Sequence, residues 1–275
     1  MTEQVTEKKP SWGLYEPAEH VDVHGVDVAY RRKGEGEPVL YLHGLGLTRR
    51  WLPFHEALAQ GSDVIAPEQP GFGETPRQDW IKDWSDVVLH TVEFADVLGL
   101  ERFHLVGYSF GGWLAAEIAA FYPERLKSLT LITPFGLRVE GHTPADIYRM
   151  TYDPFMDRCL NDRRDEFSDY VDEGGEMETR LQSYAEISAL GRVAWNPRYD
   201  YKLERRLARV TAPALVIGVD DDRILPREHV DRYAELLPNA RKAIVSGTEH
   251  PTGHGVVAQE PQLLADEILT TVKGR

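Results

Sequence analysis

The 275-residue chain contains a single cysteine, Cys159, and no long apolar run. One cysteine cannot form a disulfide within the chain or a thiolate metal site, which favours a reducing compartment. No stretch approaches the roughly 18–20 apolar residues that a membrane helix needs, and residues 1–13 lack the apolar core of a signal peptide. We therefore predict a cytoplasmic protein that does not bind a membrane.

Basic residues are also scarce, because 31 Lys and Arg stand against 45 Asp and Glu, which gives a net charge of -14. Such a charge repels nucleic-acid backbones and anionic membrane surfaces, so nucleic acid is not expected as a partner. Hydrophobic residues make up 42% of the chain, enough for a sizeable core. The length fits one large domain with an inserted lobe, and the oligomeric state is left open, a homo-oligomer included.

Short apolar runs that end at Gly or Pro alternate with segments of helical spacing. Such runs are typical of strands buried on both faces. Strands are predicted at 39–42, 64–66, 103–106, 129–132, 214–217 and 243–245, and helices at 84–98, 109–122, 230–237 and 261–272. This alternation predicts an α/β fold with a mostly parallel central sheet covered by helices on both faces.

The alternation stops between residues 135 and 209, where only amphipathic helical pieces are recognisable. A structureless loop of that length is uncommon, so we predict a helical cap at 135–209, inserted into a core formed by 16–134 and 210–275. Residues 1–15 are polar and patternless and are predicted to be a flexible N-terminus. Most aromatic residues of the cap are expected to pack onto the core; they are Tyr148, Tyr152, Phe155, Phe167, Tyr170, Tyr184, Trp195, Tyr199 and Tyr201.

Gly107-Tyr108-Ser109-Phe110-Gly111 places a Gly-x-Ser-x-Gly motif between a predicted strand and a predicted helix. A serine on so tight a turn is strained and exposed, and side chains at the flanking glycines would collide with neighbouring elements. The start of the helix directs backbone N–H groups towards charge that develops beside Ser109. A plain N-cap serine would need no catalysis, but the position on a buried parallel strand favours a nucleophile.

With these landmarks the sequence resembles the α/β-hydrolase superfamily, in the branch with a helical cap. The resemblance runs from Val21 to the final helix and implies the α/β-hydrolase fold. The matching segments, in the expected order, are Leu42-His43-Gly44-Leu45-Gly46, Gln69-Pro70-Gly71-Phe72-Gly73, Gly107 to Gly112, Tyr122-Pro123-Glu124-Arg125 and Asp222-Arg223-Ile224-Leu225-Pro226.

The resemblance further implies an oxyanion hole made by two backbone amides, those of Leu45 and Phe110. Glycines at 44 and 46 allow the loop to bend close to the nucleophile. His43 is expected to hydrogen-bond this loop rather than to act as the base.

Ser109 needs an imidazole to accept its proton and a carboxylate to orient that imidazole, and in this fold the acid precedes the base. Three consecutive carboxylates, Asp220, Asp221 and Asp222, follow the predicted strand at 214–217. Asp222 lies four residues before Pro226, the spacing typical of the family. We therefore predict Asp222 as the acid and the other two as part of a solvated turn.

Two histidines compete for the role of base. Counted from the preceding strand, His250 has the spacing typical of the family. Counted back from 260–261, where the last helix is predicted to begin, His254 has that spacing, and Gly253-His254 matches the usual dipeptide. A few extra residues lie on one side of the base or the other. The helix-side register includes an apolar pair at 256–257, so we predict His254, with His250 as the alternative.

Neither a metal nor a cofactor is expected. The two histidines could share a metal only on a helix, which Pro251 and Gly253 disfavour, and no HExxH motif or paired cysteines supply further ligands. No GxGxxG motif opens a helix after a strand.

A serine nucleophile excludes relatives that use aspartate at this position. We predict a small-molecule hydrolase that cleaves a carboxylic ester or a related acyl compound, such as a lactone or thioester, through an acyl-enzyme. Two alternatives stay open. One is a hydrolase of carbon–carbon bonds in ring-cleavage diketones, although the Ser-rich loop of that subgroup is replaced by Leu45-Gly46-Leu47-Thr48. The other is a hydrolase-like ligand-binding protein with little turnover.

Overall fold

The computed structural model describes residues 17–171 and 176–274. The N-terminal segment 1–15, predicted as flexible, lies outside the described residues. An eight-stranded sheet forms the centre, in the order β1-β2-β4-β3-β5-β6-β7-β8. Its strands are β1 (Glu19–Val23), β2 (Val26–Lys33), β3 (Pro38–Leu42), β4 (Asp63–Pro67), β5 (Phe103–Tyr108), β6 (Leu126–Ile132), β7 (Ala214–Val219) and β8 (Ala240–Val245). β2 pairs antiparallel with β1 and β4, and the remaining pairs are parallel, which confirms the predicted sheet.

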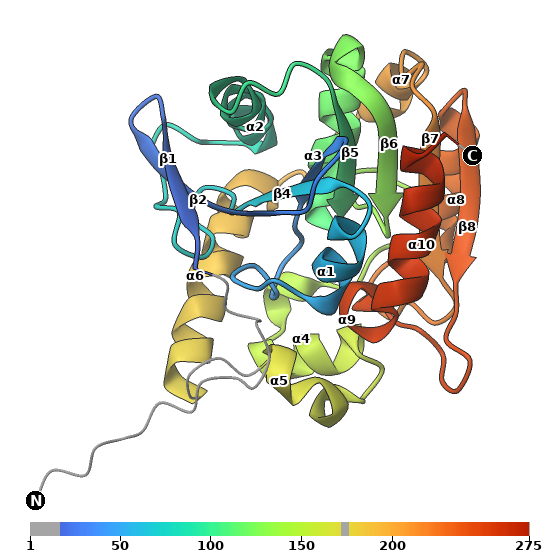
Figure 1. Ribbon diagram of the computed structural model, residues 1–275. Helices are drawn as coiled ribbons and strands as arrows, with labels where there is room; N and C mark the ends of the chain where they lie inside the picture. The colour runs from blue at the N-terminus through green and yellow to red at the C-terminus, as the bar shows by residue number, and fades with distance from the viewer. Residues whose placement is uncertain (1–16, 172–175, 275) are drawn as a thin grey trace, which may run out of the picture.

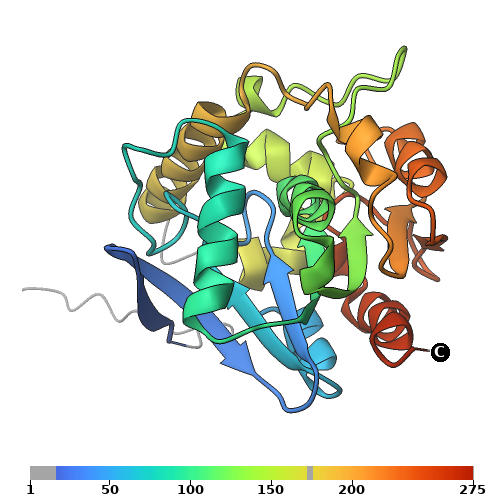
Figure 2. The ribbon, with the colours of Figure 1, turned by 90° about the horizontal axis from the view of Figure 1, so that it is seen from above.

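Helices cover both faces of this sheet (Figures 1 and 2). α2 (Trp84–Val97), α3 (Phe110–Phe121) and α8 (Arg227–Leu236) share one hydrophobic cluster. α1 (Pro53–Ala59), α9 (Val256–Gln259) and α10 (Pro261–Val272) contribute to a second cluster on the opposite face. The 3-10 turn η1 (Pro123–Arg125) leads from α3 into β6. The sheet is therefore the middle layer of three.

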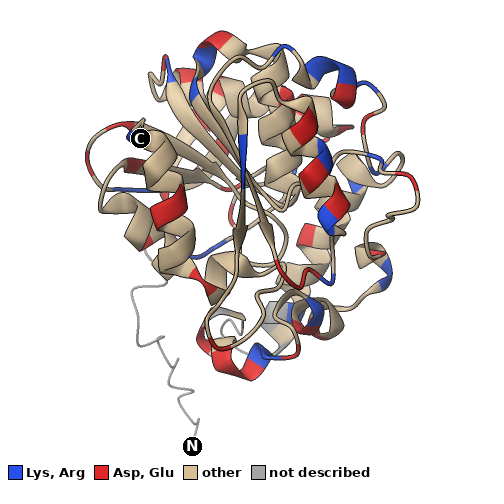
Figure 3. Cartoon of the chain, turned by 90° about the vertical axis from the view of Figure 1, so that its right-hand side faces the viewer, with Lys and Arg blue, Asp and Glu red and all other residues tan. Residues whose placement is uncertain are grey.

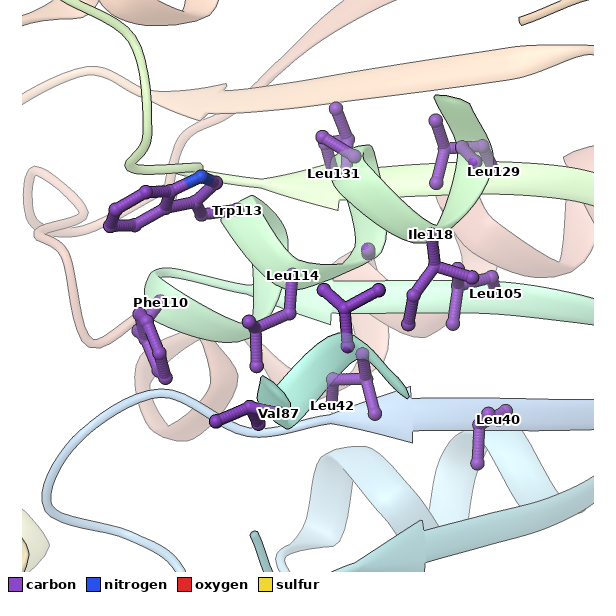
Figure 4. Close-up of a cluster of buried hydrophobic side chains, with 14 of the residues drawn as sticks. Leu40, Leu42, Val87, Leu105, Phe110, Trp113, Leu114, Ile118, Leu129 and Leu131 are labelled. Carbon is purple, nitrogen blue, oxygen red and sulfur yellow. The ribbon is translucent and has the colours of Figure 1, made fainter. Parts of the chain in front are cut away.

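Helix α3 is buried on nearly all sides, because every residue from Phe110 to Ala120 is buried. Figure 4 shows Leu114 and Ile118 of this helix beside Leu42 and Leu105 of the sheet. Burying one such side chain fully is worth about 1.5–3 kcal/mol. The helix that follows Ser109 is therefore held rigidly against β3 and β5.

Between β6 and β7 the described residues form helices and no strand. These are η2 (Ile147–Arg149), α4 (Tyr152–Cys159), η3 (Arg164–Phe167), α5 (Ser168–Val171), α6 (Glu176–Ala194) and α7 (Leu203–Leu207). α4, α5 and α6 lie at the carboxyl ends of the strands (Figure 1). α7 differs, because Leu203 and Leu207 are fully buried in the cluster that contains α3. The last part of the 135–209 segment thus packs on the core.

Acidic and basic side chains are interspersed over the outer helices, whereas the strands in the middle carry few of them (Figure 3). The net negative charge therefore belongs mainly to surfaces that face solvent. Among the described residues, no helix combines the length and the apolar character that a membrane crossing requires.

Candidate active site

Ser109 forms the turn between β5 and α3 in a conformation that is unusual for a residue with a side chain, with φ 57° and ψ -116°. A Cβ atom on Gly107 would lie 2.3 Å from the Gly111 carbonyl oxygen, and one on Gly111 would lie 2.1 Å from the Leu42 carbonyl oxygen. Only glycine fits at either position. Backbone strain of this kind costs about 1–3 kcal/mol and persists only where the surrounding structure enforces it.

Ser109, His254 and Asp222 form one continuous hydrogen-bonded chain. His254 Nε2 lies 2.9 Å from Ser109 Oγ, and His254 Nδ1 lies 2.8 Å from Asp222 Oδ2. A carboxylate oxygen only accepts hydrogen bonds, so Nδ1 carries the imidazole proton and Nε2 is left to accept the proton of the serine hydroxyl. His254 is 1% exposed, so little water can compete for the hydrogen bonds of its imidazole.

The three neighbouring carboxylates have different partners. Asp222 Oδ1 accepts hydrogen bonds from the backbone amides of Ile224 and Leu225, both at 2.8 Å, which leaves Oδ2 for His254. Asp220 instead accepts from Thr252 N and from the Ser246 hydroxyl. Asp221 accepts from Asn161 Nδ2 and Arg223 Nε. Of the three, only Asp222 is bonded to the imidazole.

The structure also separates the two candidate histidines. His254 lies two residues before α9, whereas His250 is exposed on the loop that follows β8. In that loop Gly247 N donates to the Thr252 hydroxyl, and Asp220 holds both ends of the excursion. The extra residues therefore lie between β8 and His254, on the strand side of the imidazole. The Tyr108 hydroxyl donates to the His254 carbonyl at 2.9 Å and anchors the following turn.

The two predicted oxyanion amides are present and unengaged, because no described residue accepts a hydrogen bond from Leu45 N or Phe110 N. Phe110 is the first residue of α3, where helix geometry supplies no internal acceptor. His43 holds the Leu45 loop from the core side: Nδ1 donates to Gly44 O at 2.7 Å and Nε2 accepts from Gln69 N at 3.0 Å. Burial lowers the pKa of His43 to about 4, so it is neutral at pH 7.

Comparison with known proteins identifies the family of this chain. Residues 39–267 match the family described as the alpha/beta hydrolase family. The chain belongs to this family. The match includes every strand from β3 onwards as well as the cap, so the predicted family and fold class are confirmed.

Individual relatives of this alpha/beta hydrolase carry different names. A 2-hydroxy-6-oxononadienedioate/2-hydroxy-6-oxononatrienedioate hydrolase of Burkholderia vietnamiensis is 30% identical over 78% of this chain and 81% of its own length. The dihydrolipoyllysine-residue acetyltransferase component of an acetoin cleaving system from Cupriavidus necator is also 30% identical, over 76% of this chain. The chain spans only 59% of that relative.

A solved structure, that of a meta-cleavage product hydrolase from Pseudomonas fluorescens IP01, superposes with a TM-score of 0.75. It is 23% identical and is matched over 93% of this chain and 97% of its own. At that identity the likeness establishes the shared fold alone.

The hydrogen-bonded chain opens into a cavity of about 530 Å³, lined by Ser109, Phe110, His254 and Leu45 together with cap residues. Its lining includes the apolar side chains of Trp113, Phe135 and Leu190 as well as two arginines, Arg138 and Arg198. Five of the nine cap aromatics also line it, and these are the cap aromatics that face the pocket: Tyr148, Phe155, Trp195, Tyr199 and Tyr201.

The cap also holds the loop that carries His254, a feature that the sequence pattern does not reveal. The Cys159 carbonyl, at the end of α4, accepts from Gly255 N at 2.8 Å. Asn161 Nδ2 donates to the Asp221 side chain at 3.1 Å. A Cβ on Gly253 would lie 2.5 Å from Asn161 Oδ1, so this contact is close. No cluster of metal-ligating side chains was found within the part of the chain that the structure describes.

Proposed function

We propose that this alpha/beta hydrolase is a serine hydrolase that cleaves a small to medium carboxylic ester or a related acyl compound. The observation that carries the proposal is the Ser109–His254–Asp222 hydrogen-bonded chain at the wall of a largely apolar cavity. A volume of about 530 Å³ lies within the range of small-molecule pockets. The cap supplies much of its lining, and we propose that it acts as the lid that selects the substrate.

In the proposed reaction, Ser109 Oγ attacks the substrate carbonyl carbon while its proton passes to His254 Nε2. Asp222 keeps the imidazole in the required tautomer and stabilises its charged form. The negative charge on the carbonyl oxygen is stabilised by the Leu45 and Phe110 amides. His254 then protonates the leaving alcohol, and a water molecule releases the acyl group from Ser109 by the same route.

A carbon–carbon bond hydrolase is the second candidate, and the names of the relatives favour it as much as an esterase. The same residues would use one water molecule, whose hydroxyl group ends on the ketone carbonyl carbon and whose proton ends on the departing carbon as the carbon–carbon bond breaks. The substrates named for the Burkholderia relative are dicarboxylates, and the arginines at 138 and 198 would suit an anionic substrate.

A substrate panel distinguishes these candidates. The purified protein is assayed with p-nitrophenyl esters of increasing acyl length and with a 2-hydroxy-6-oxo-hexa-2,4-dienoate, whose loss of absorbance is followed directly. We expect sustained ester turnover with an optimum at one chain length, because a pocket of limited volume has a finite depth. Faster cleavage of the dienoate would assign the carbon–carbon reaction. Ligand-induced stabilisation without turnover of either substrate would indicate a binding protein.

The assignment of the acid is tested by three matched substitutions. Asp222→Asn is expected to lower kcat by about four orders of magnitude, because an amide at this position favours the wrong imidazole tautomer. Asp220→Asn and Asp221→Asn are expected to retain kcat within about twofold. Asn at 221 keeps the one acceptor oxygen that is used, and Asn at 220 keeps an oxygen for Thr252 N while its NH2 group can donate to the Ser246 hydroxyl. Ester hydrolysis by the three purified variants gives the comparison. Losses of similar size at all three positions would contradict the role of Asp222.

A further inference from the structure

The loop that carries the Leu45 amide is held from two directions. On its N-terminal side, Gln69 of the core donates a side-chain hydrogen bond to the His43 carbonyl at 3.0 Å. On its C-terminal side, the contact comes from the cap, because Gly46 N donates to Glu186 Oε2 of α6 at 3.3 Å. The Leu45 amide lies between these two attachments, so its direction depends on both the core and the cap.

Glu186 is an unusual residue for this position, because its side chain is only 2% exposed. Burial of a carboxylate is costly unless hydrogen bonds compensate for the lost water. Gln182, one turn earlier in α6, donates to Glu186 Oε1 at 2.8 Å, and Gly46 N donates to Glu186 Oε2. Both residues line a hollow of only about 20 Å³ together with the buried Arg50, whose positive charge favours a carboxylate there.

Gly46 is also in contact with another helix of the cap, α4. Its φ of 97° is a conformation that favours glycine, and a Cβ there would lie 3.3 Å from Met156 Sδ and Phe155 Cε1 of α4. The loop is thus enclosed between α4 and α6. A glycine-rich loop has little conformational preference of its own, so these contacts decide where its amides point.

We propose that Glu186 is a positioning residue, through which the cap orients the Leu45 amide for the oxyanion. This inference rests on the proposed serine-hydrolase function. Oxyanion donors act only when they are held within a fraction of an ångström of their productive geometry. The hydrogen bond from Gly46 N to Glu186 fixes the peptide that follows Leu45. The cap therefore completes the oxyanion hole in addition to covering the cavity.

The proposal is tested with Glu186→Ala and Glu186→Gln, and with Ser183→Ala as a matched control. Ser183 lies on the same helix and lines the same hollow, but no described hydrogen bond joins it to the loop. Each variant is assayed for kcat and KM with the best ester, for inhibition by a trifluoromethyl ketone, and for inhibition by the product acid. The ketone forms an oxyanion on the serine, whereas the product acid reports ground-state binding.

We expect Glu186→Ala to lower kcat by about tenfold or more and to weaken the ketone in parallel, with KM and product inhibition within about twofold of the parent. Glu186→Gln keeps an acceptor for Gly46 N and is expected to recover most of the loss. Ser183→Ala is expected to behave as the parent. Unchanged kcat in folded Glu186→Ala, or an equal weakening of ketone and product acid, would overturn the proposal.

Two further measurements keep the outcomes separate. If Glu186→Ala does not fold, Glu186→Asp retains the charge but withdraws the acceptor by one methylene, and the same selective loss of kcat is expected. Labelling of the parent by a fluorophosphonate reports on Ser109 itself. A parent that neither labels nor turns over esters contradicts the proposed function, whereas a reactive parent with an unaffected Glu186→Ala contradicts only the role of Glu186.

Discussion

Ser109→Ala is expected to abolish ester hydrolysis, with a loss in kcat of roughly a million-fold. Removal of Oγ ends the covalent route, and only the weak catalysis of the oxyanion amides and the cavity remains. The backbone is expected to keep its strained turn, because alanine retains the Cβ and α3 is buried against the sheet. The measurements are kcat with the best ester and the intact mass after exposure to a fluorophosphonate.

The controls for this variant are its circular dichroism spectrum and its affinity for the product acid, both of which should match the parent. Ser109→Gly provides a second comparison, because glycine accepts a φ of 57° without strain and should raise the melting temperature while remaining inactive. Residual turnover of Ser109→Ala near the parent rate would remove this serine from the mechanism.

His254→Ala is expected to reduce kcat by several orders of magnitude, because Nε2 is the only described imidazole nitrogen bonded to Ser109 Oγ. His250→Ala is expected to stay within about twofold of the parent, since its side chain is exposed on the loop outside the cavity lining. The two substituted histidines are four positions apart in the same loop, so the two variants form a matched pair. The reverse ranking would transfer the role of base to His250.

Chemical rescue makes this second comparison sharper. His254 lines the cavity, so its removal leaves a space that is open to small molecules. Added imidazole is expected to restore part of the turnover of His254→Ala and to leave Ser109→Ala inactive, because only the former keeps the nucleophile. Equal rescue of both variants would show that the reaction takes place elsewhere.

Contacts from one inserted segment reach both sides of the proposed site. The Cys159 carbonyl holds the loop around His254, Asn161 holds the backbone at Asp221 beside the predicted acid, and Glu186 holds the loop around Leu45. These contacts connect the cap to the proposed base and to the proposed oxyanion amide independently. Rearrangement of the cap would consequently alter the positions of reacting groups as well as access to the cavity.

Much of the fold and of the local surroundings of Ser109 followed from the sequence alone. Buried parallel strands are short apolar runs because both of their faces are covered. Such a run consists of consecutive residues, so it can be recognised in the sequence. The turn at Ser109 could also be predicted from the sequence. Its two flanking glycines, two residues from the serine on either side, are required because a Cβ atom there would collide with neighbouring backbone. In both cases the physical cause acts over a short stretch of chain.

The partners of Ser109 were decided by the tertiary structure. Asp220, Asp221 and Asp222 share one chemistry, and Asp222 is distinguished by an imidazole 32 residues away that only the packing of β7 against β8 brings near. The choice between His250 and His254 depended on whether the extra residues of the loop lie before or after the imidazole that contacts Ser109. Glu186 had no sequence signal at all, because its contact with Gly46 spans 140 residues. Periodicity and turn preference encode local geometry, whereas hydrogen bonds between distant loops exist only after the sheet and cap have packed together.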